Sequence, residues 1–168
     1  YNPYQPLWGA IHWGHASSSD LVHWQDHPLA LTPGPGGGDA QGCWSGCVVN
    51  DDGKPSAIYT GFIQPDQTPV MLARAQDPDL LTWQKSPYNP IIPEPPSGVT
   101  TTDFRDPYVW KDGQSWHMAL GAGVQNGDSA ILHYRSIDLV DWSYKGLLSN
   151  AQKSHQSNTW ECPNFFKL

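Results

Sequence analysis

The sequence predicts an all-β fold, and three observations support this prediction. First, 16 Pro and 16 Gly are distributed over 168 residues, and no uninterrupted helical period of ordinary length is found between them. Second, 9 Trp, 7 Tyr and 4 Phe accompany only 15% charged residues, a composition typical of a packed protein rather than a disordered one. Third, the chain contains an internal repeat whose units resemble short strands joined by turns.

The repeat is an Asp-Leu-x-x-Trp segment that occurs three times, with its Trp residues 59 residues apart (83 − 24 and 142 − 83). An Asp-Gly pair, typical of a hairpin turn, and an alternating apolar run recur in the same phase. These features lie at 20–24, 79–83 and 138–142 (repeat), 52–53 and 112–113 (turns), and 70–73 and 131–134 (alternating runs). Four short strands per unit are the pattern of a β-propeller blade. A β-sandwich with evenly spaced Trp residues is the alternative, and the threefold match counts against it.

The 59-residue period divides the chain into about 2.8 blades of a single partial propeller domain over 1–168. We expect the later part of blade 1 in 1–35, blade 2 in 43–88, blade 3 in 103–150 and the first strand of blade 4 in 159–168. Closed propellers have about four to eight blades. We therefore expect the chain to be a piece of a larger protein and to be inactive alone.

Composition and charge exclude several classes of function. A net charge of −7 with only nine Lys and Arg argues against a nucleic-acid partner. No apolar run approaches the roughly 20 residues that cross a bilayer, so we expect no membrane partner. The acidic balance suits a neutral substrate handled by carboxylates. The sequence indicates no particular oligomeric state.

No metal or cofactor site is expected. The His pairs at 12 and 15 and at 23 and 27 have no Cys or carboxylate clustered at ligand spacing, and the Gly-rich segment 34–38 lacks the features of a phosphate-binding loop. Cys43, Cys47 and Cys162 are predicted to be free thiols, which favours a reducing compartment such as the cytoplasm. The chain begins with Tyr rather than Met, so export stays open.

Polar residues recur at one position in each unit, the start of the first strand, within 44–49, 104–109 and 160–165. In a propeller these strand ends gather at one mouth of the central channel, so Ser45, Asp106 and Glu161 should face a common pocket. Trp faces stack on sugar rings and carboxylates accept hydroxyl donors, so the pocket is predicted to bind carbohydrate.

Two carboxyl groups beside a glycosidic bond are the usual tools of glycoside hydrolysis. Glu161 lies between Trp160 and Cys162, and apolar neighbours favour the protonated form that a general acid needs. Asp106 follows Arg105, and a nearby cation favours the ionised form. The alternative for both is a structural role in capping the strand ladder.

Several motifs, in order along the chain, resemble glycoside hydrolase family 32, the invertases, inulinases and fructan hydrolases. They are Arg-Asp-Pro at 105–107, Glu-Cys-Pro at 161–163, Trp-Ser-Gly at 44–46 and the Trp- and His-rich stretch 8–24. The resemblance implies a five-bladed propeller, usually followed by a β-sandwich domain that this chain does not contain. It also implies hydrolysis of terminal β-D-fructofuranosyl residues, as in sucrose or fructans, with retention and without a cofactor.

The resemblance also implies site roles. Glu161 would be the general acid/base and Asp106 the transition-state stabiliser. The nucleophile of the family is an Asp in an Asn-Asp-Pro-Asn-Gly motif, which this sequence lacks and which we expect upstream of Tyr1. The residues implied to line the fructose subsite are Trp8, Trp44, Ser45 and Arg105.

Two other functions stay open. A related five-bladed glycosidase acting on arabinans would use similar strand-start carboxylates, but in a different context from the Trp-Ser-Gly and Glu-Cys-Pro motifs found here. A non-catalytic carbohydrate-binding propeller would have a substituted nucleophile. Hydrolysis also cannot be separated from fructosyl transfer on these residues alone.

Overall fold

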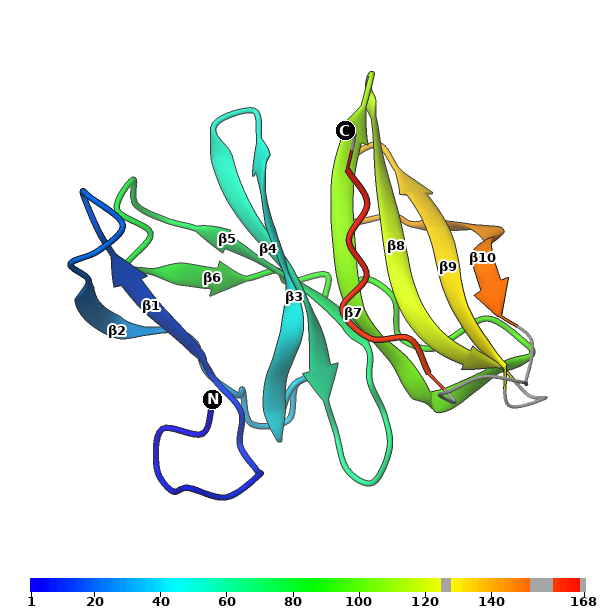
Figure 1. Cartoon of the computed structure of the whole chain (residues 1–168), viewed down its shortest axis with the longest axis horizontal. Helices are drawn as coiled ribbons and strands as arrows, with labels where there is room; N and C mark the ends of the chain where they lie inside the picture. Colours follow the sequence, from blue (N-terminus) through cyan, green and yellow to red (C-terminus); the bar gives the residue numbers. More distant parts are fainter. Residues whose placement is uncertain (125–127, 152–158, 167–168) are drawn as a thin grey trace.

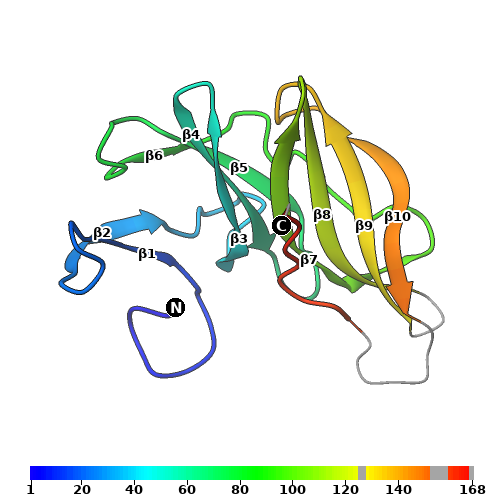
Figure 2. The ribbon, with the colours of Figure 1, turned by 45° about the horizontal axis from the view of Figure 1, so that its top comes forward.

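The computed structural model is all-β and describes residues 1–124, 128–151 and 159–166. Within these residues, ten strands form three antiparallel sheets (Figures 1 and 2). The first sheet comprises β1 (Trp13–Ser17) and β2 (Gln25–Leu31). The middle sheet comprises β3 (Gly42–Asp51), β4 (Lys54–Phe62), β5 (Val70–Ala75) and β6 (Trp83–Lys85). The last sheet comprises β7 (Val99–Asp112), β8 (Ser115–Val124), β9 (Ser129–Ser136) and β10 (Ser143–Ala151).

Each four-stranded sheet is a meander in which consecutive strands pair. The sheets follow one another in chain order, with β3 and β7 packed together (Figure 1). This is the arrangement of propeller blades and not that of a sandwich. Within the described residues no helix is long or apolar enough to cross a membrane.

The described residues differ from the predicted elements at two places. Residues 159–166 run beside β7 in both views but contain no strand, because no strand pairs with them within the described ranges (Figures 1 and 2). Residues 125–127 of the predicted blade 3, and 167–168 of the predicted strand in blade 4, lie outside the described residues. The β7–β8 turn is the second difference: Asp112 pairs with Ser115, so the turn begins at Gly113 rather than at Asp112.

Strand β4 of the middle sheet is buried on both faces, and side-chain alternation along this strand explains why. Ala57 and Tyr59 of β4 belong to an apolar cluster shared with Leu31 of the first sheet. Ile58, between them, belongs to a second cluster shared with Leu132 of the last sheet. Successive residues of a strand point to opposite faces. Because another sheet covers each face of β4, consecutive residues of this strand are all buried.

The 59-residue repeat forms the same turn three times. Its Leu has a left-handed backbone conformation at Leu21 (φ 63°), Leu80 (φ 60°) and Leu139 (φ 66°). The indole N–H of the Trp three residues later donates to the main-chain oxygen of that Leu, at 3.3 Å (Trp24), 2.8 Å (Trp83) and 3.0 Å (Trp142). The repeat is therefore a structural turn that closes on itself.

A carboxylate also supports each turn, but from two different positions. Asp20 and Asp138 accept main-chain N–H groups from the residues that follow them, as the repeat pattern suggests. In the middle sheet Asp77 accepts from Leu81 and Thr82 instead, where the repeat pattern points to Asp79. An Asp two residues earlier can cap the same turn because its carboxylate reaches the same N–H groups.

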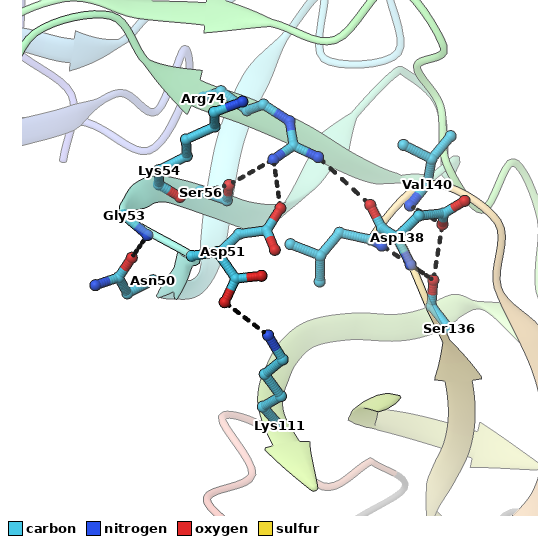
Figure 3. A network of polar contacts seen from close by, with 12 residues as sticks. Asn50, Asp51, Gly53, Lys54, Ser56, Arg74, Lys111, Ser136, Asp138 and Val140 are labelled. Atoms are coloured by element: carbon cyan, nitrogen blue, oxygen red, sulfur yellow. Dashed lines mark hydrogen bonds and ion pairs between the residues drawn. The ribbon is translucent and has the colours of Figure 1, made fainter. Parts of the chain in front are cut away.

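Polar contacts join the middle and last sheets near the β3–β4 hairpin (Figure 3). The guanidinium of Arg74 donates to the Asp51 carboxylate at 2.8 Å and to the main-chain oxygen of Asp138 at 3.4 Å. The Lys111 ammonium lies 3.1 Å from the Asp52 carboxylate. The Arg74–Asp51 pair lies within the middle sheet, and the contacts of Arg74 with Asp138 and of Lys111 with Asp52 connect the two sheets. The exposed Lys111–Asp52 pair contributes little stability.

Candidate active site

Two β-bulges at equivalent positions shape the inner ends of the middle and last sheets. In β3, residues 44–45 lie opposite Thr60 alone, and in β7, residues 106–107 lie opposite Leu120 alone. A bulge bends its strand and redirects the side chains at that point. The bulges therefore turn Trp44, Ser45 and Asp106 toward the same space.

That space is a pocket of about 370 Å³. It brings together all six residues that the sequence singles out, although they are as far apart in the chain as 8 and 161. The lining residues are Trp8, Ile11, Trp44, Ser45, Arg105, Asp106, Glu161 and Cys162. Ile11 was not predicted; it lies at the pocket because its main-chain oxygen accepts the N–H of Cys43, at the start of β3, at 2.8 Å.

Aromatic rings form one wall of the pocket. The Trp44 ring stacks on Phe62 with centroids 4.3 Å apart and an interplanar angle of 17°, and it meets Trp8 edge-on at 5.9 Å. The indole N–H of Trp13 donates to the main-chain oxygen of Trp44 at 2.8 Å. Trp44 is thus held from two sides, whereas Trp8 is 79% exposed and offers an open ring.

Asp106 is buried in a left-handed backbone conformation with φ 64°. Its N–H donates to the hydroxyl oxygen of Thr60 at 2.8 Å. Its carboxylate oxygen Oδ2 accepts the main-chain N–H of Cys162 at 3.0 Å and faces the Cys162 thiol at 3.5 Å. A left-handed conformation costs a residue other than Gly roughly 1–2 kcal/mol, so these contacts stabilise an unfavourable geometry.

Glu161 forms an ion pair with Arg105, with Nη2 and Oε1 2.5 Å apart. The Glu161 side chain is 61% exposed and that of Arg105 is 18% exposed. This corrects the expectation that apolar neighbours enclose Glu161, and it gives Glu161 the cation that we expected to serve Asp106. Adjacent residues of a strand point in different directions, so neighbours in sequence need not be partners in space.

Cys162 adopts the same left-handed conformation as Asp106, with φ 47°. Burial and, next, the negative charge of Asp106 raise the pKa of the Cys162 thiol above its ordinary value. The thiol therefore remains protonated and can act as a hydrogen-bond donor toward Asp106. A protonated thiol is a weak nucleophile, so this contact does not favour a nucleophilic role for Cys162.

The described residues contain no group of three or more His, Cys, Asp and Glu side chains that could hold a metal ion. The His residues of the two sequence pairs have other contacts. The ring of His15 is tilted against that of His27 with centroids 4.7 Å apart, Nδ1 of His12 lies 2.5 Å from the oxygen of Ala10, and His23 bonds to Asp20 at 2.7 Å.

Known proteins resemble this chain over its whole length. Residues 1–168 match the family described as "Glycosyl hydrolases family 32 N-terminal domain". The sucrose-6-phosphate hydrolase of Escherichia coli is 37% identical over 174 residues, covering 100% of this chain and 35% of the relative.

Solved structures give the same result for the fold. A variant of fructan 1-exohydrolase IIa from Cichorium intybus in complex with 1-kestose has a TM-score of 0.87 at 35% identity, over 97% of this chain and 31% of that one. A variant of the family 32 β-fructofuranosidase of Bombyx mori in complex with sucrose has a TM-score of 0.86 at 32% identity, over 100% and 35%. The chain therefore spans about a third of the length of these relatives.

Proposed function

This chain belongs to glycosyl hydrolase family 32, and from this premise we propose that the whole protein removes terminal β-D-fructofuranosyl residues from substrates such as sucrose or fructans. The observation that supports the proposal most directly is that Asp106 and Glu161, brought from separate segments, line one pocket with Trp8 and Trp44. Indole rings can stack on a sugar, and two carboxyl groups can cleave its glycosidic bond.

In the proposed reaction, protonated Glu161 donates its proton to the glycosidic oxygen as the bond to the fructosyl anomeric carbon breaks. A carboxylate nucleophile, an Asp that we expect upstream of Tyr1, forms a bond to the same carbon. Glu161 then removes a proton from water, the water oxygen attacks the anomeric carbon, and the nucleophile leaves as carboxylate. Two inversions give net retention, and the nucleophile should lie about 5–5.5 Å from Glu161.

Asp106 and Arg105 have distinct proposed roles. The Asp106 carboxylate accepts fructosyl hydroxyls and stabilises the positive charge that develops in the transition state. Arg105 holds Glu161 through an ion pair with one of its two carboxylate oxygens. In the proposed complex the guanidinium also donates to a hydroxyl of the bound sugar.

A second candidate function is carbohydrate binding without catalysis. The Arg105–Glu161 ion pair favours it, because a carboxylate held by a guanidinium is an acceptor for sugar hydroxyls rather than a proton donor. Membership in family 32 removes the support for the arabinan-type alternative.

The test uses the full-length protein and its Glu161→Gln variant. We expect fructose release from sucrose to fall about 10²–10⁴-fold, because the amide cannot protonate the leaving oxygen. A fructosyl substrate whose leaving group needs no proton should regain part of the rate. Glu94→Gln, at an exposed carboxylate outside the pocket, is the matched control and should retain full activity.

Two outcomes would contradict the proposal. Near-normal hydrolysis by Glu161→Gln would remove Glu161 from the general-acid role. Binding of sucrose by the wild-type protein without any release of fructose would favour the binding function instead.

A further inference from the structure

The bulge in β7 leaves one buried donor outside the strand ladder. Asp106 and Pro107 lie opposite a single residue, and Pro107 has no N–H. The N–H of Asp106 therefore needs a partner from elsewhere, because an unpaired buried N–H is unfavourable. Thr60 supplies this partner from the neighbouring sheet, through its hydroxyl oxygen at 2.8 Å.

Thr60 is unusual for its position. It lies opposite the bulge in β3, as Leu120 lies opposite the bulge in β7, and both are fully buried. The two positions are also equivalent in the repeat, since Tyr-Thr-Gly at 59–61 corresponds to Ala-Leu-Gly at 119–121. An apolar side chain is thus accommodated at this place in one sheet, and a hydroxyl is present in the other, where it contacts Asp106.

A second main-chain N–H at the pocket, that of Cys162, also donates to a side chain from a distant part of the chain. Cys162, like Asp106, has a left-handed backbone, and its N–H donates to the Asp106 carboxylate at 3.0 Å. Thr60 thus holds the main chain of Asp106, and Asp106 holds the main chain of Cys162, the residue after Glu161. We call these two contacts the cross-sheet bonds; they link the middle sheet, the last sheet and segment 159–166.

We propose that Thr60 is a positioning residue for the proposed hydrolysis. Its hydroxyl fixes the main chain of Asp106, so that the Asp106 carboxylate points into the pocket and also sets the main chain next to Glu161. This inference rests on the proposed function. Thr60 does not line the pocket and so acts only through Asp106.

The experiment is a double-mutant cycle on the full-length protein with sucrose as substrate. Thr60→Val keeps the shape and removes the acceptor; we expect kcat to fall about 10- to 100-fold, with a smaller change in KM. Thr60→Ser, which restores the hydroxyl, should recover most of kcat. In the Asp106→Asn background, Thr60→Val should cost less than a further threefold, because the group that Thr60 positions is already disabled.

The controls separate this inference from the proposed function. Thr82→Val removes another threonine hydroxyl, one that bonds to Asp77 in an exposed turn, and should leave kcat unchanged. If the wild-type protein is inactive, or Asp106→Asn loses no activity, the proposed function fails. If Asp106→Asn loses activity and Thr60→Val does not, only the role of Thr60 fails.

A purely structural role for the hydroxyl would also overturn the inference. It would give equal fold-losses in the wild-type and Asp106→Asn backgrounds. The structural role would also be indicated if Thr60→Val and Thr60→Ala both fail to fold while Thr60→Ser is native. Should Thr60→Val alone fail to fold, Thr60→Ala takes its place in the cycle.

Discussion

Left-handed residues other than glycine occur both in the outer turns and at the pocket, and those in the two regions are stabilised differently. In the outer turns, Leu21, Leu80 and Leu139 are supported by groups within five residues along the chain. At the pocket, Asp106 and Cys162 are supported by groups 46 and 56 residues away.

The difference separates structure from function. A turn that closes through its own Leu and Trp can recur at each repeat, even though the supporting carboxylate comes from different positions. A left-handed residue held from another sheet has the correct geometry only when the sheets are assembled. Unfavourable backbone conformations that depend on distant partners are concentrated at functional sites, and the pocket follows this rule.

The largest expected effect comes from disabling the pocket itself. Asp106→Asn in the full-length protein should lower kcat on sucrose about 10³-fold, because the negative charge that stabilises the transition state is lost. The melting temperature should stay close to that of the wild type, since the amide oxygen can still accept the N–H of Cys162. Asp112→Asn, on the exposed end of the same strand, is the control. An unfolded Asp106→Asn variant would instead indicate a structural residue.

A smaller effect should follow from separating the last sheet from segment 159–166. A methyl group at Gly121 would overlap the main-chain oxygen of Trp160, next to Glu161. Gly121→Ala should therefore lower stability by about 1–3 kcal/mol and reduce kcat as well. Gly37→Ala, where the nearest atom would be 3.4 Å away, should change neither quantity. Denaturant unfolding and sucrose kinetics on the same samples would show whether both effects occur together.

Breaking an outer turn should affect stability alone. Trp142→Phe removes the indole N–H that donates to the oxygen of Leu139 at 3.0 Å and should cost about 1 kcal/mol. We expect kcat on sucrose to be unchanged at temperatures where the variant is folded. A loss of kcat comparable to that of Asp106→Asn would remove the distinction between the two regions.

The smallest effect concerns the pH dependence of an outer turn. Burial alone would raise the pKa of Asp138, but hydrogen bonds from the N–H groups of Asp141 and Val140 outweigh it, and the pKa is lowered. A carboxyl whose pKa is lower when folded stabilises above its unfolded pKa, near 3.9, and loses this contribution as the pH falls through the folded value.

The comparison of wild-type protein with Asp138→Asn tests this contribution. Their difference in unfolding free energy should be at most about 0.5 kcal/mol at pH 6, given the exposure of Asp138, and should shrink below pH 4. A difference that grows as the pH falls would contradict the assigned direction.

The fold was predictable from the sequence because its signals are local. The spacing of Trp24, Trp83 and Trp142 marks turns that close within a few residues, and an all-β part of a five-bladed propeller is confirmed by the three antiparallel sheets and by membership in family 32. The pocket was predictable as a gathering of equivalent positions of successive blades, since propeller topology brings such positions together. The prediction that these positions are strand starts was wrong, because Asp106 lies inside β7 and Glu161 lies in no strand.

The partners within the pocket were not predictable, because they depend on the direction of each side chain at the bulges. Arg105 precedes Asp106 in sequence but pairs with Glu161. The sequence contains one indication of the role of Thr60, a hydroxyl at the position where the next repeat has Leu120. This indication could be interpreted only once the position of the Asp106 N–H was known.

The cross-sheet bonds also affect the order of events during folding. Hairpins and the outer turns can form while each sheet is still separate, because their partners are close in sequence. The bond between Asp106 and Thr60 can form only after the middle and last sheets have docked, and the bond between Cys162 and Asp106 only after segment 159–166 has packed beside β7. We therefore expect refolding full-length protein to regain its β-sheet circular dichroism first and its ability to release fructose only later.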